Sequence, residues 1–168
     1  MFQQEKALLG DIQLVYLHWR GLKQDNSEKK NILLLHGMAD NSLVWLKLGG
    51  FLSAKYNNYD IVAPDLRGHG NSSRPETGYY THHYLQDISG LLQHLNWEKV
   101  HIIAHSWSAK IACIFATKFP NYCKSLTLVD PFFINSMPSV FRVTFPILYK
   151  LLPFLKLMQT RITIRQKK

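Results

Sequence analysis

The sequence predicts an α/β fold in which helices cover both faces of a mostly parallel β-sheet. The first indication is a set of four short apolar runs, each as long as a buried strand, at residues 32–35, 61–63, 102–104 and 126–129. The second is that helical patterns separate these runs, as they do when crossover helices connect parallel strands. The third is size, since 168 residues with 46% hydrophobic side chains can build one domain with a sizeable core.

The strands follow one another in a simple order. Residues 11–20 alternate between apolar and polar side chains, which predicts a strand near an edge of the sheet. The segments at 31–35, 60–63, 100–104 and 125–129 are more continuously apolar, which predicts strands buried on both faces. The sheet is therefore expected to contain at least five strands.

Three helices are predicted between these strands. Asp40 or Asn41 can cap a helix over residues 43–52, in which the pair Gly49-Gly50 is a weak point. A second helix over 81–95 carries an apolar face at helical spacing, formed by Tyr84, Leu85, Ile88, Leu91, Leu92 and Leu95. A third helix is indicated by Ile111, Ala112, Phe115, Ala116 and Phe119. These helices would cover the sheet.

A single serine occupies the junction between a predicted strand and the helix after it. Ser106 follows the apolar run that ends at Ala104 and precedes the third helical pattern. So sharp a turn exposes a hydroxyl at the carboxyl end of the sheet, and the first N–H groups of the helix point at whatever the hydroxyl attacks. Small residues are needed on both flanks, because strand and helix nearly touch there. Ala104 meets this need, whereas Ser108 adds a Cβ and a hydroxyl where close packing favours neither.

Two motifs carry a resemblance to a known family. The run AHSWS at 104–108 is similar to the nucleophile elbow G-x-S-x-G, and PDLRGHGNS at 64–72 matches the loop after the fourth strand in epoxide-hydrolase-like and esterase-like proteins. The sequence therefore resembles the α/β-hydrolase superfamily. The resemblance covers about residues 10–133 and implies the N-terminal part of the core, a truncated fold that lacks the C-terminal strands. Residues 134–168 resemble the start of a helical lid followed by a basic tail.

The resemblance implies a role for each of four residues. Ser106 would be the nucleophile, and the N–H groups of Met38 and Trp107 would form the oxyanion hole. Asp130, at the end of the last predicted strand, is the candidate acid and the only carboxylate after the nucleophile. The loop at 64–72 is expected to be structural rather than catalytic.

The general base is missing from this set. A serine is activated when a histidine takes its proton, and the chain order in this family is serine, then acid, then histidine. No histidine lies beyond His105. His36 and His69 are expected to pack loops, and His105 is expected to project away from the Ser106 hydroxyl. We therefore expect residues 1–168 alone to have little or no esterase activity.

Charge and composition limit the partners. The formal net charge is +9, but residues 131–168 hold seven basic and no acidic residues, so the remaining 13 basic and 11 acidic residues leave the first 130 residues at +2. The basicity belongs to the tail, which indicates weak contact with an anionic lipid surface rather than nucleic-acid binding. Prolines and charged residues interrupt the apolar segment 141–158, which argues against a membrane span.

Cysteine usage and the first residues bear on the compartment. Cys113 and Cys123, the second placed in a loop, make neither a disulfide framework nor a CxxC motif, so reduced thiols in a cytoplasmic protein are expected. The first ten residues include Glu5 and Lys6 and no long apolar core, so no signal peptide is expected. No metal and no cofactor are predicted.

Two functions remain open at this point. The first is a serine hydrolase that acts on an ester or similar acyl bond of a small molecule and is incomplete in this chain. The second is a non-catalytic protein that uses the fold as a binding or membrane-surface module. In either case the strand at 125–129 would leave an edge open to pairing, which predicts self-association unless residues 141–158 cover that edge.

Overall fold

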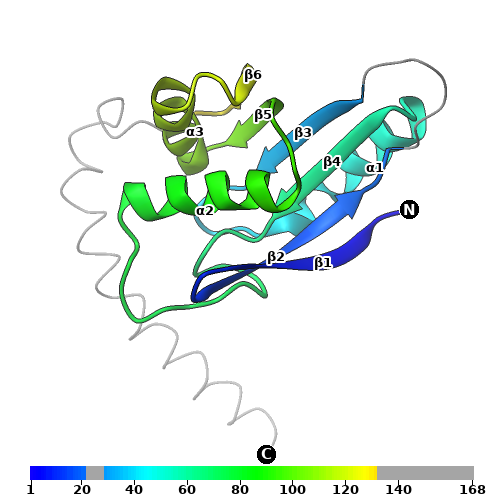
Figure 1. The fold of residues 1–168 in the computed structure, drawn as a ribbon. Coiled ribbons are helices and arrows are strands. Elements are labelled where there is room, and N and C mark those ends of the chain that lie inside the picture. The colour runs from blue at the N-terminus through cyan, green and yellow to red at the C-terminus, as the bar shows by residue number, and fades with distance from the viewer. Residues whose placement is uncertain (22–28, 132–168) are drawn as a thin grey trace, which may run out of the picture. The chain divides into compact units, whose positions relative to one another are not determined.

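A six-stranded sheet forms the centre of the described part of the chain (Figure 1). The computed structural model describes residues 1–21 and 29–131. The strands lie in the order β1-β2-β4-β3-β5-β6, and their bounds are Gln3–Leu9 for β1, Ile12–Trp19 for β2, Lys30–Leu35 for β3, Tyr59–Pro64 for β4, Val100–His105 for β5 and Cys123–Val129 for β6. β3 pairs in parallel with β4 and β5, and β5 in parallel with β6, whereas β1 pairs antiparallel with β2 and β2 antiparallel with β4. The predicted mostly parallel α/β sheet is confirmed.

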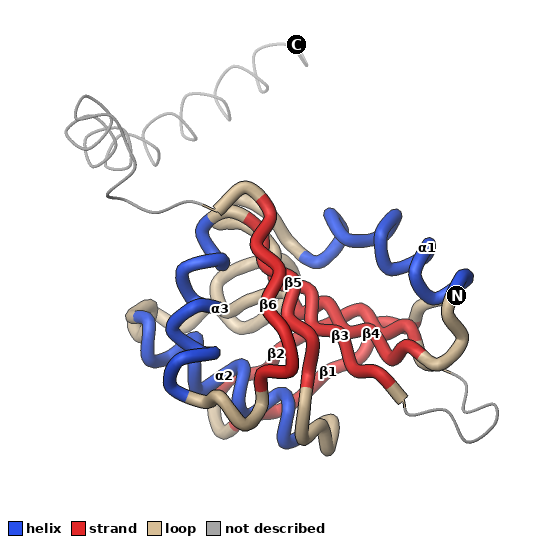
Figure 2. The backbone as a smooth tube through the Cα atoms, turned by 90° about the horizontal axis from the view of Figure 1, so that it is seen from above, coloured by secondary structure: helices blue, strands red, loops and turns tan. Residues whose placement is uncertain are grey.

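Helices cover both faces of this sheet, as predicted. Figure 2 shows α1 on one side of the strands and α2 and α3 on the other. The bounds are Ser42–Trp45 for the 3₁₀ helix η1, Leu46–Lys55 for α1, Thr81–His94 for α2 and Trp107–Lys118 for α3. Alternate residues of β3 belong to two hydrophobic clusters, one on each face of the sheet. Leu33 and Leu35 pack with α2 and α3 on one face. Ile32 and Leu34 pack with η1 and α1 on the other.

The first strand of the sheet has no counterpart among the predicted elements. β1 forms one edge of the sheet, and β2, predicted to lie near an edge, is the next strand, between β1 and β4. Every residue of β2 except Gln13 is buried, whereas β1 buries only Ala7. Hydrophobic alternation did not predict β1, because an edge strand buries little of either face and can carry polar side chains. Cys123 also differs from expectation, since it begins β6 instead of lying in a loop.

The two adjacent glycines of α1 have different structural roles. A Cβ on Gly49 would lie 2.7 Å from ring atoms of the buried Trp19, so α1 approaches β2 closely only because this position lacks a side chain. A Cβ on Gly50 would meet nothing within 4 Å. The predicted weak point thus contains one glycine, Gly49, that packing against Trp19 requires, and one, Gly50, that packing does not require.

This difference gives a matched pair of variants. Gly50→Ala is expected to raise the free energy of unfolding by up to about 1 kcal/mol, because alanine favours helix over glycine. Gly49→Ala is expected to lower it by roughly 1 to 3 kcal/mol, because the added methyl displaces the Trp19 ring. Urea unfolding followed by circular dichroism measures both changes. Equal effects of the two substitutions would contradict the assigned contact.

Candidate functional site

Ser106 lies alone between β5 and α3. Its backbone has φ 54° and ψ −118°, so a residue with a side chain adopts the region that favours glycine. The Ser106 N–H donates to the Val129 carbonyl over 2.9 Å, which joins the turn to the end of β6. β5 ends at His105 and α3 begins at Trp107, so the predicted strand-to-helix turn is present. The nucleophilic role of Ser106 stays a prediction.

The flanking positions explain how this turn tolerates the absence of glycine. Ala104 and Ser108 are both fully buried. The Ser108 hydroxyl lies 2.9 Å from the Leu35 carbonyl and 3.0 Å from the His105 carbonyl, at the ends of β3 and β5. The buried hydroxyl of Ser108, which was expected to disfavour close packing, therefore has hydrogen-bond acceptors. Helix α3 still starts directly after the turn.

The turn after β3 rests against the turn at Ser106. A Cβ on Gly37 would lie 3.1 Å from both Asp40 Oδ2 and His105 Nδ1, and 3.4 Å from the Ser106 Cβ. The next residue is Met38, whose side chain is 42% exposed. Gly37 therefore lies close to Ser106, and the role of the Met38 N–H in an oxyanion hole stays a prediction.

The buried His36 ring holds this turn in place through both of its nitrogens. The ring is fully buried; its Nδ1 donates to the Gly37 carbonyl over 2.7 Å, and its Nε2 accepts the Leu66 N–H over 3.0 Å. Burial lowers the pKa of His36 to about 4, so the ring is neutral at neutral pH. Both ring nitrogens are occupied, which agrees with the structural interpretation of His36.

The loop at 64–72 is also held by buried polar contacts. Asp65 accepts the Ser42 N–H over 2.7 Å and the Asn71 N–H over 2.8 Å. At a more exposed contact, His69 places Nε2 2.6 Å from the Met38 carbonyl, so this loop also holds the turn after β3. These contacts support the prediction that the loop is structural, and they also show how it positions the Met38 turn.

Asp130 follows directly on the strand end that holds Ser106. Its backbone has φ 45°, and its side chain is exposed. Because Val129 is bonded to Ser106 N–H, Asp130 lies one residue from that contact. Trp107 packs its ring edge-on against Tyr84, with centroids 4.9 Å apart. The four predicted site residues therefore gather at the edge where the parallel strands end.

One pair beside the elbow was not recognised from the sequence as a unit. His105 Nδ1 lies 3.7 Å from Asp40 Oδ2, and both side chains are about one-third exposed. Asn41, not Asp40, provides the cap of η1, since its side chain accepts the Leu43 N–H. The signal available in the sequence was that His105 shares a strand face with Ile103, on the η1 side of the sheet.

Neither a metal site nor a membrane-spanning helix is found in the described part of the chain. Over residues 1–21 and 29–131, no group of three or more His, Cys, Asp or Glu side chains is arranged to hold a metal ion. In the same residues, no helix is both long and apolar enough to cross a membrane.

Comparison with known proteins identifies the class. The family model for the alpha/beta hydrolase fold matches residues 30–159, and the chain belongs to this family. The solved structures that resemble it include an epoxide hydrolase, CorEH, with a TM-score of 0.68 and 26% identity over 78% of this chain and 43% of that one. E-2-(acetamidomethylene)succinate hydrolase has a TM-score of 0.64 and 32% identity over 75% of this chain and 43% of that one.

Two of three curated relatives carry hydrolase names. An uncharacterised protein of Mycobacterium tuberculosis is 38% identical over 99 residues, 59% of this chain and 28% of the relative. Epoxide hydrolase 2 of Siraitia grosvenorii is 33% identical over 111 residues, 65% of this chain and 34% of the relative. 2-(Acetamidomethylene)succinate hydrolase of Mesorhizobium japonicum is 35% identical over 99 residues, 59% of this chain and 34% of the relative. The matched part of the chain thus spans about a third of the length of these relatives, and it represents the N-terminal part of the fold.

Proposed function

We propose that this chain is the N-terminal part of a serine hydrolase in which Ser106 attacks an ester or similar acyl bond of a small molecule. The observation that carries the proposal is the positive φ of Ser106 between β5 and α3. Such a conformation costs on the order of 1 to 3 kcal/mol and persists only where the surrounding structure holds it. The strained residue stands between the end of β5 and the N-terminus of α3, beside the Gly37 turn, which supports a role for its hydroxyl there.

The same geometry supports a way to stabilise the reaction. When Ser106 Oγ bonds to the acyl carbon, the carbonyl oxygen becomes negatively charged and needs donors. Trp107 is the first residue of α3, so its N–H has no acceptor within the helix. Met38 N–H, on the turn packed beside Ser106, is the proposed second donor. Expulsion of the leaving group would leave an acyl ester on Ser106, which water then hydrolyses.

The proton transfer is the step that these residues do not complete. Asp130 is the proposed acid that would orient a histidine, yet no histidine follows Ser106 in the sequence. His36 has both ring nitrogens engaged. Without a base, oxyanion donors and binding leave an acceleration on the order of a thousandfold over water. We therefore expect residues 1–168 to show only weak esterase activity alone.

The chemistry of the nucleophile favours an acyl substrate over an epoxide, although several relatives are named epoxide hydrolases. A serine oxygen that opened an epoxide would form an ether, which water does not cleave under mild conditions, so the enzyme could not be regenerated. A serine oxygen that attacks an acyl group forms an ester, which water does cleave. Ser106 at the elbow therefore supports ester or related acyl hydrolysis.

The proposal can be tested by supplying the missing base. Residues 1–168 are incubated with p-nitrophenyl acetate and imidazole, and acetylated peptides are quantified by mass spectrometry. We expect Ser106 to be acetylated at least about tenfold faster than Ser89, whose hydroxyl bonds only to the Gln86 carbonyl within α2. Neither Ser106→Ala nor Ser89→Ala should change the acetylation of the other serine. Equal acetylation of the two serines would refute the assignment.

A second candidate function rests on the composition of the tail. Seven basic and no acidic residues in 131–168 support a module that contacts an anionic lipid surface without catalysis. The seven basic residues all lie in 132–168, outside the described part of the chain, and vesicle sedimentation tests this function. Binding that requires the tail, combined with Ser106 acetylation no faster than that of Ser89, would favour this function.

Two further properties belong to the proposal. Self-association through β6 is proposed because, among the described residues, β6 pairs only with β5. A cytoplasmic location is proposed because both cysteines are free thiols. Sedimentation velocity over a range of concentrations tests the first of these properties.

A further inference from the structure

A carboxylate, a histidine ring and the candidate nucleophile meet at one position beside the turn after β3. A Cβ built on Gly37 would lie 3.1 Å from both Asp40 Oδ2 and His105 Nδ1. The Ser106 Cβ lies 3.4 Å from the same position. In a regular strand, neighbouring side chains such as those of His105 and Ser106 point to opposite faces. Here the positive φ of Ser106 breaks that alternation, and both side chains approach one region.

The Asp40 carboxylate is held at this position by the turn itself. The Asp40 N–H donates to the Gly37 carbonyl over 3.3 Å, which closes the turn after β3. Asn41 caps η1, so the Asp40 carboxylate is not used by that helix. It lies 3.7 Å from His105 Nδ1. A carboxylate on this side favours the ring proton on Nδ1 and leaves Nε2 to accept another.

Three histidines lie around this turn, and His105 differs from the other two. His36 has both ring nitrogens engaged. His69 places Nδ1 3.0 Å from the Arg67 carbonyl and Nε2 2.6 Å from the Met38 carbonyl. In the described part of the chain no hydrogen bond occupies His105 Nε2, and this side chain is 34% exposed. His105 therefore keeps one ring nitrogen open to take a proton.

We propose that His105, oriented by Asp40, accepts the proton of Ser106 through one bridging water. The inference rests on the proposed function of Ser106. An acid, a base and a nucleophile are recognised by their geometry and roles, and their order along the chain differs between folds. The sequence order typical of the family therefore does not exclude a base that stands before the serine.

The proton transfer accompanies acylation. The bond from Ser106 Oγ to the acyl carbon forms, the bond from that carbon to the leaving group breaks, and the leaving group departs with its electron pair. The Oγ proton passes through the water to His105 Nε2 and is then released to solvent. A well-placed base contributes a hundredfold or more, and we expect about tenfold from a base that acts through a water. The activity of residues 1–168 alone therefore stays weak.

The test measures acetylation of Ser106 by p-nitrophenyl acetate without imidazole, relative to Ser89 in the same sample. His105→Gln is expected to lower the relative rate about tenfold. Asp40→Asn should lower it by no more than that, because the carboxylate acts through the ring. Saturating imidazole should bring both variants to the rate of the unmodified chain, since it replaces the ring. Both positions are about one-third exposed, so the variants are expected to fold.

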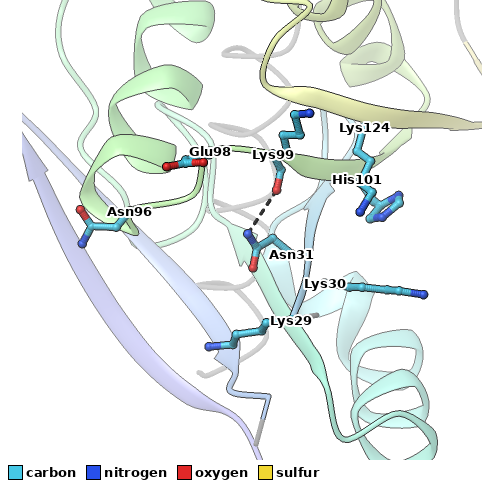
Figure 3. A pocket seen from close by; sticks show the side chains of 8 residues that line it. All are labelled: Lys29, Lys30, Asn31, Asn96, Glu98, Lys99, His101 and Lys124. Atoms are coloured by element: carbon cyan, nitrogen blue, oxygen red, sulfur yellow. Dashed lines mark hydrogen bonds between the residues drawn. The ribbon is translucent and has the colours of Figure 1, made fainter. Parts of the chain in front are cut away.

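His101→Gln is the matched control. His101 lies on the same face of β5 as His105 but at the other end of the strand, where it lines a hollow with Lys124 (Figure 3). Its Nδ1 lies 2.7 Å from Ser125 Oγ. The substitution removes an imidazole from the same strand at a distance from Ser106, and acetylation of Ser106 should be unchanged.

The dependence on pH is a second readout that a purely structural role would not change. The neutral ring of His105 is the form that accepts a proton, so acetylation of Ser106 should rise with pH over the range in which histidine loses its charge. The other titratable groups on the segments that meet here are Asp40, Asp130, His69 and the neutral His36. These groups remain in His105→Gln, in which the rise should disappear.

Two outcomes would overturn the inference while the proposed function stands. One is a relative rate in His105→Gln, without imidazole, equal to that of the unmodified chain. The other is a lower rate that imidazole does not restore, or a rise with pH that persists in the variant, which would assign His105 to support of the turn alone. If Ser106 is acetylated no faster than Ser89 even with imidazole, the proposed function fails, and the inference fails with it.

Discussion

Arg67→Met is expected to lower the free energy of unfolding by about 3 to 5 kcal/mol. Arg67 Nε and Nη2 donate to the two carboxylate oxygens of Asp87 over 2.5 and 2.6 Å, and Nη1 donates to the Gly78 carbonyl over 2.6 Å. The side chains are only 6% and 4% exposed, so removal of the guanidinium leaves a buried carboxylate without its partner. Urea unfolding followed by tryptophan fluorescence measures the loss.

Two controls separate this effect from a general loss of charge. Arg74→Met removes an exposed arginine that bonds to the Gly70 carbonyl over 3.1 Å, and a change under about 1 kcal/mol is expected. Arg67→Met/Asp87→Leu removes both charges and should recover part of the stability lost in the single variant. A cost below about 1 kcal/mol for Arg67→Met would show that the pair is not as deeply buried as described.

The same pair supports the candidate site at a distance. Asp87 lies on α2, so the ion pair joins the loop after β4 to that helix. The Arg67 guanidinium also lies over the Tyr84 ring, 5.9 Å from its centroid, and Tyr84 contacts the Trp107 ring. We therefore expect Arg67→Met to reduce Ser106 acetylation as well as stability, because the first turn of α3 packs on this arrangement.

Acid is expected to remove about 2 kcal/mol of stability through Asp60 as the pH falls from about 4 to about 2. Burial raises the pKa of the Asp60 carboxyl, but hydrogen bonds from His18 and Lys29 outweigh burial and hold the pKa at about 2, below its usual 3.8. His18 Nε2 lies 2.9 Å from Asp60, and the Gly21 N–H donates over 3.2 Å. The folded state therefore binds this proton less readily than the unfolded state, and the stabilisation is present above pH 4.

Glu5 adds to the same acid dependence. Burial raises the pKa of Glu5, but His18 and Arg20 together lower it by more than burial raises it, so the pKa is below its usual value. Protonation of Glu5 weakens its contact with Arg20, whose Nη2 lies 2.8 Å from both carboxylate oxygens. Both carboxylates thus favour the folded state at neutral pH and lose that effect in acid.

Comparison of variants isolates the part that belongs to Asp60. Urea unfolding at pH 6, 4 and 3 should show a smaller fall in stability for Asp60→Asn than for the unmodified chain, because an amide does not titrate. Glu98→Gln, at an exposed position, should follow the unmodified chain. If Asp60→Asn loses stability in acid as steeply as the unmodified chain, Asp60 does not carry this dependence.

Local patterns in the sequence determined much of this structure. The apolar face of α2 packs on the sheet as its spacing predicted, with Leu91 and Leu92 fully buried. The turn at Ser106 also follows from neighbouring residues alone, since an apolar strand, a small residue and a helical pattern stand next to one another. Such features depend on propensity and spacing within about a dozen residues, which the sequence displays directly.

Only the tertiary structure decided which distant segments meet. β1 is polar and became a strand because it pairs with β2, and Gly49 became essential because Trp19 lies beneath it. The buried hydroxyl of Ser108 found its acceptors at the ends of two strands. The pattern of apolar residues in a sequence predicts which residues are buried, but it does not predict which residue lies opposite on the neighbouring strand. That partner is decided by the packing of the whole chain.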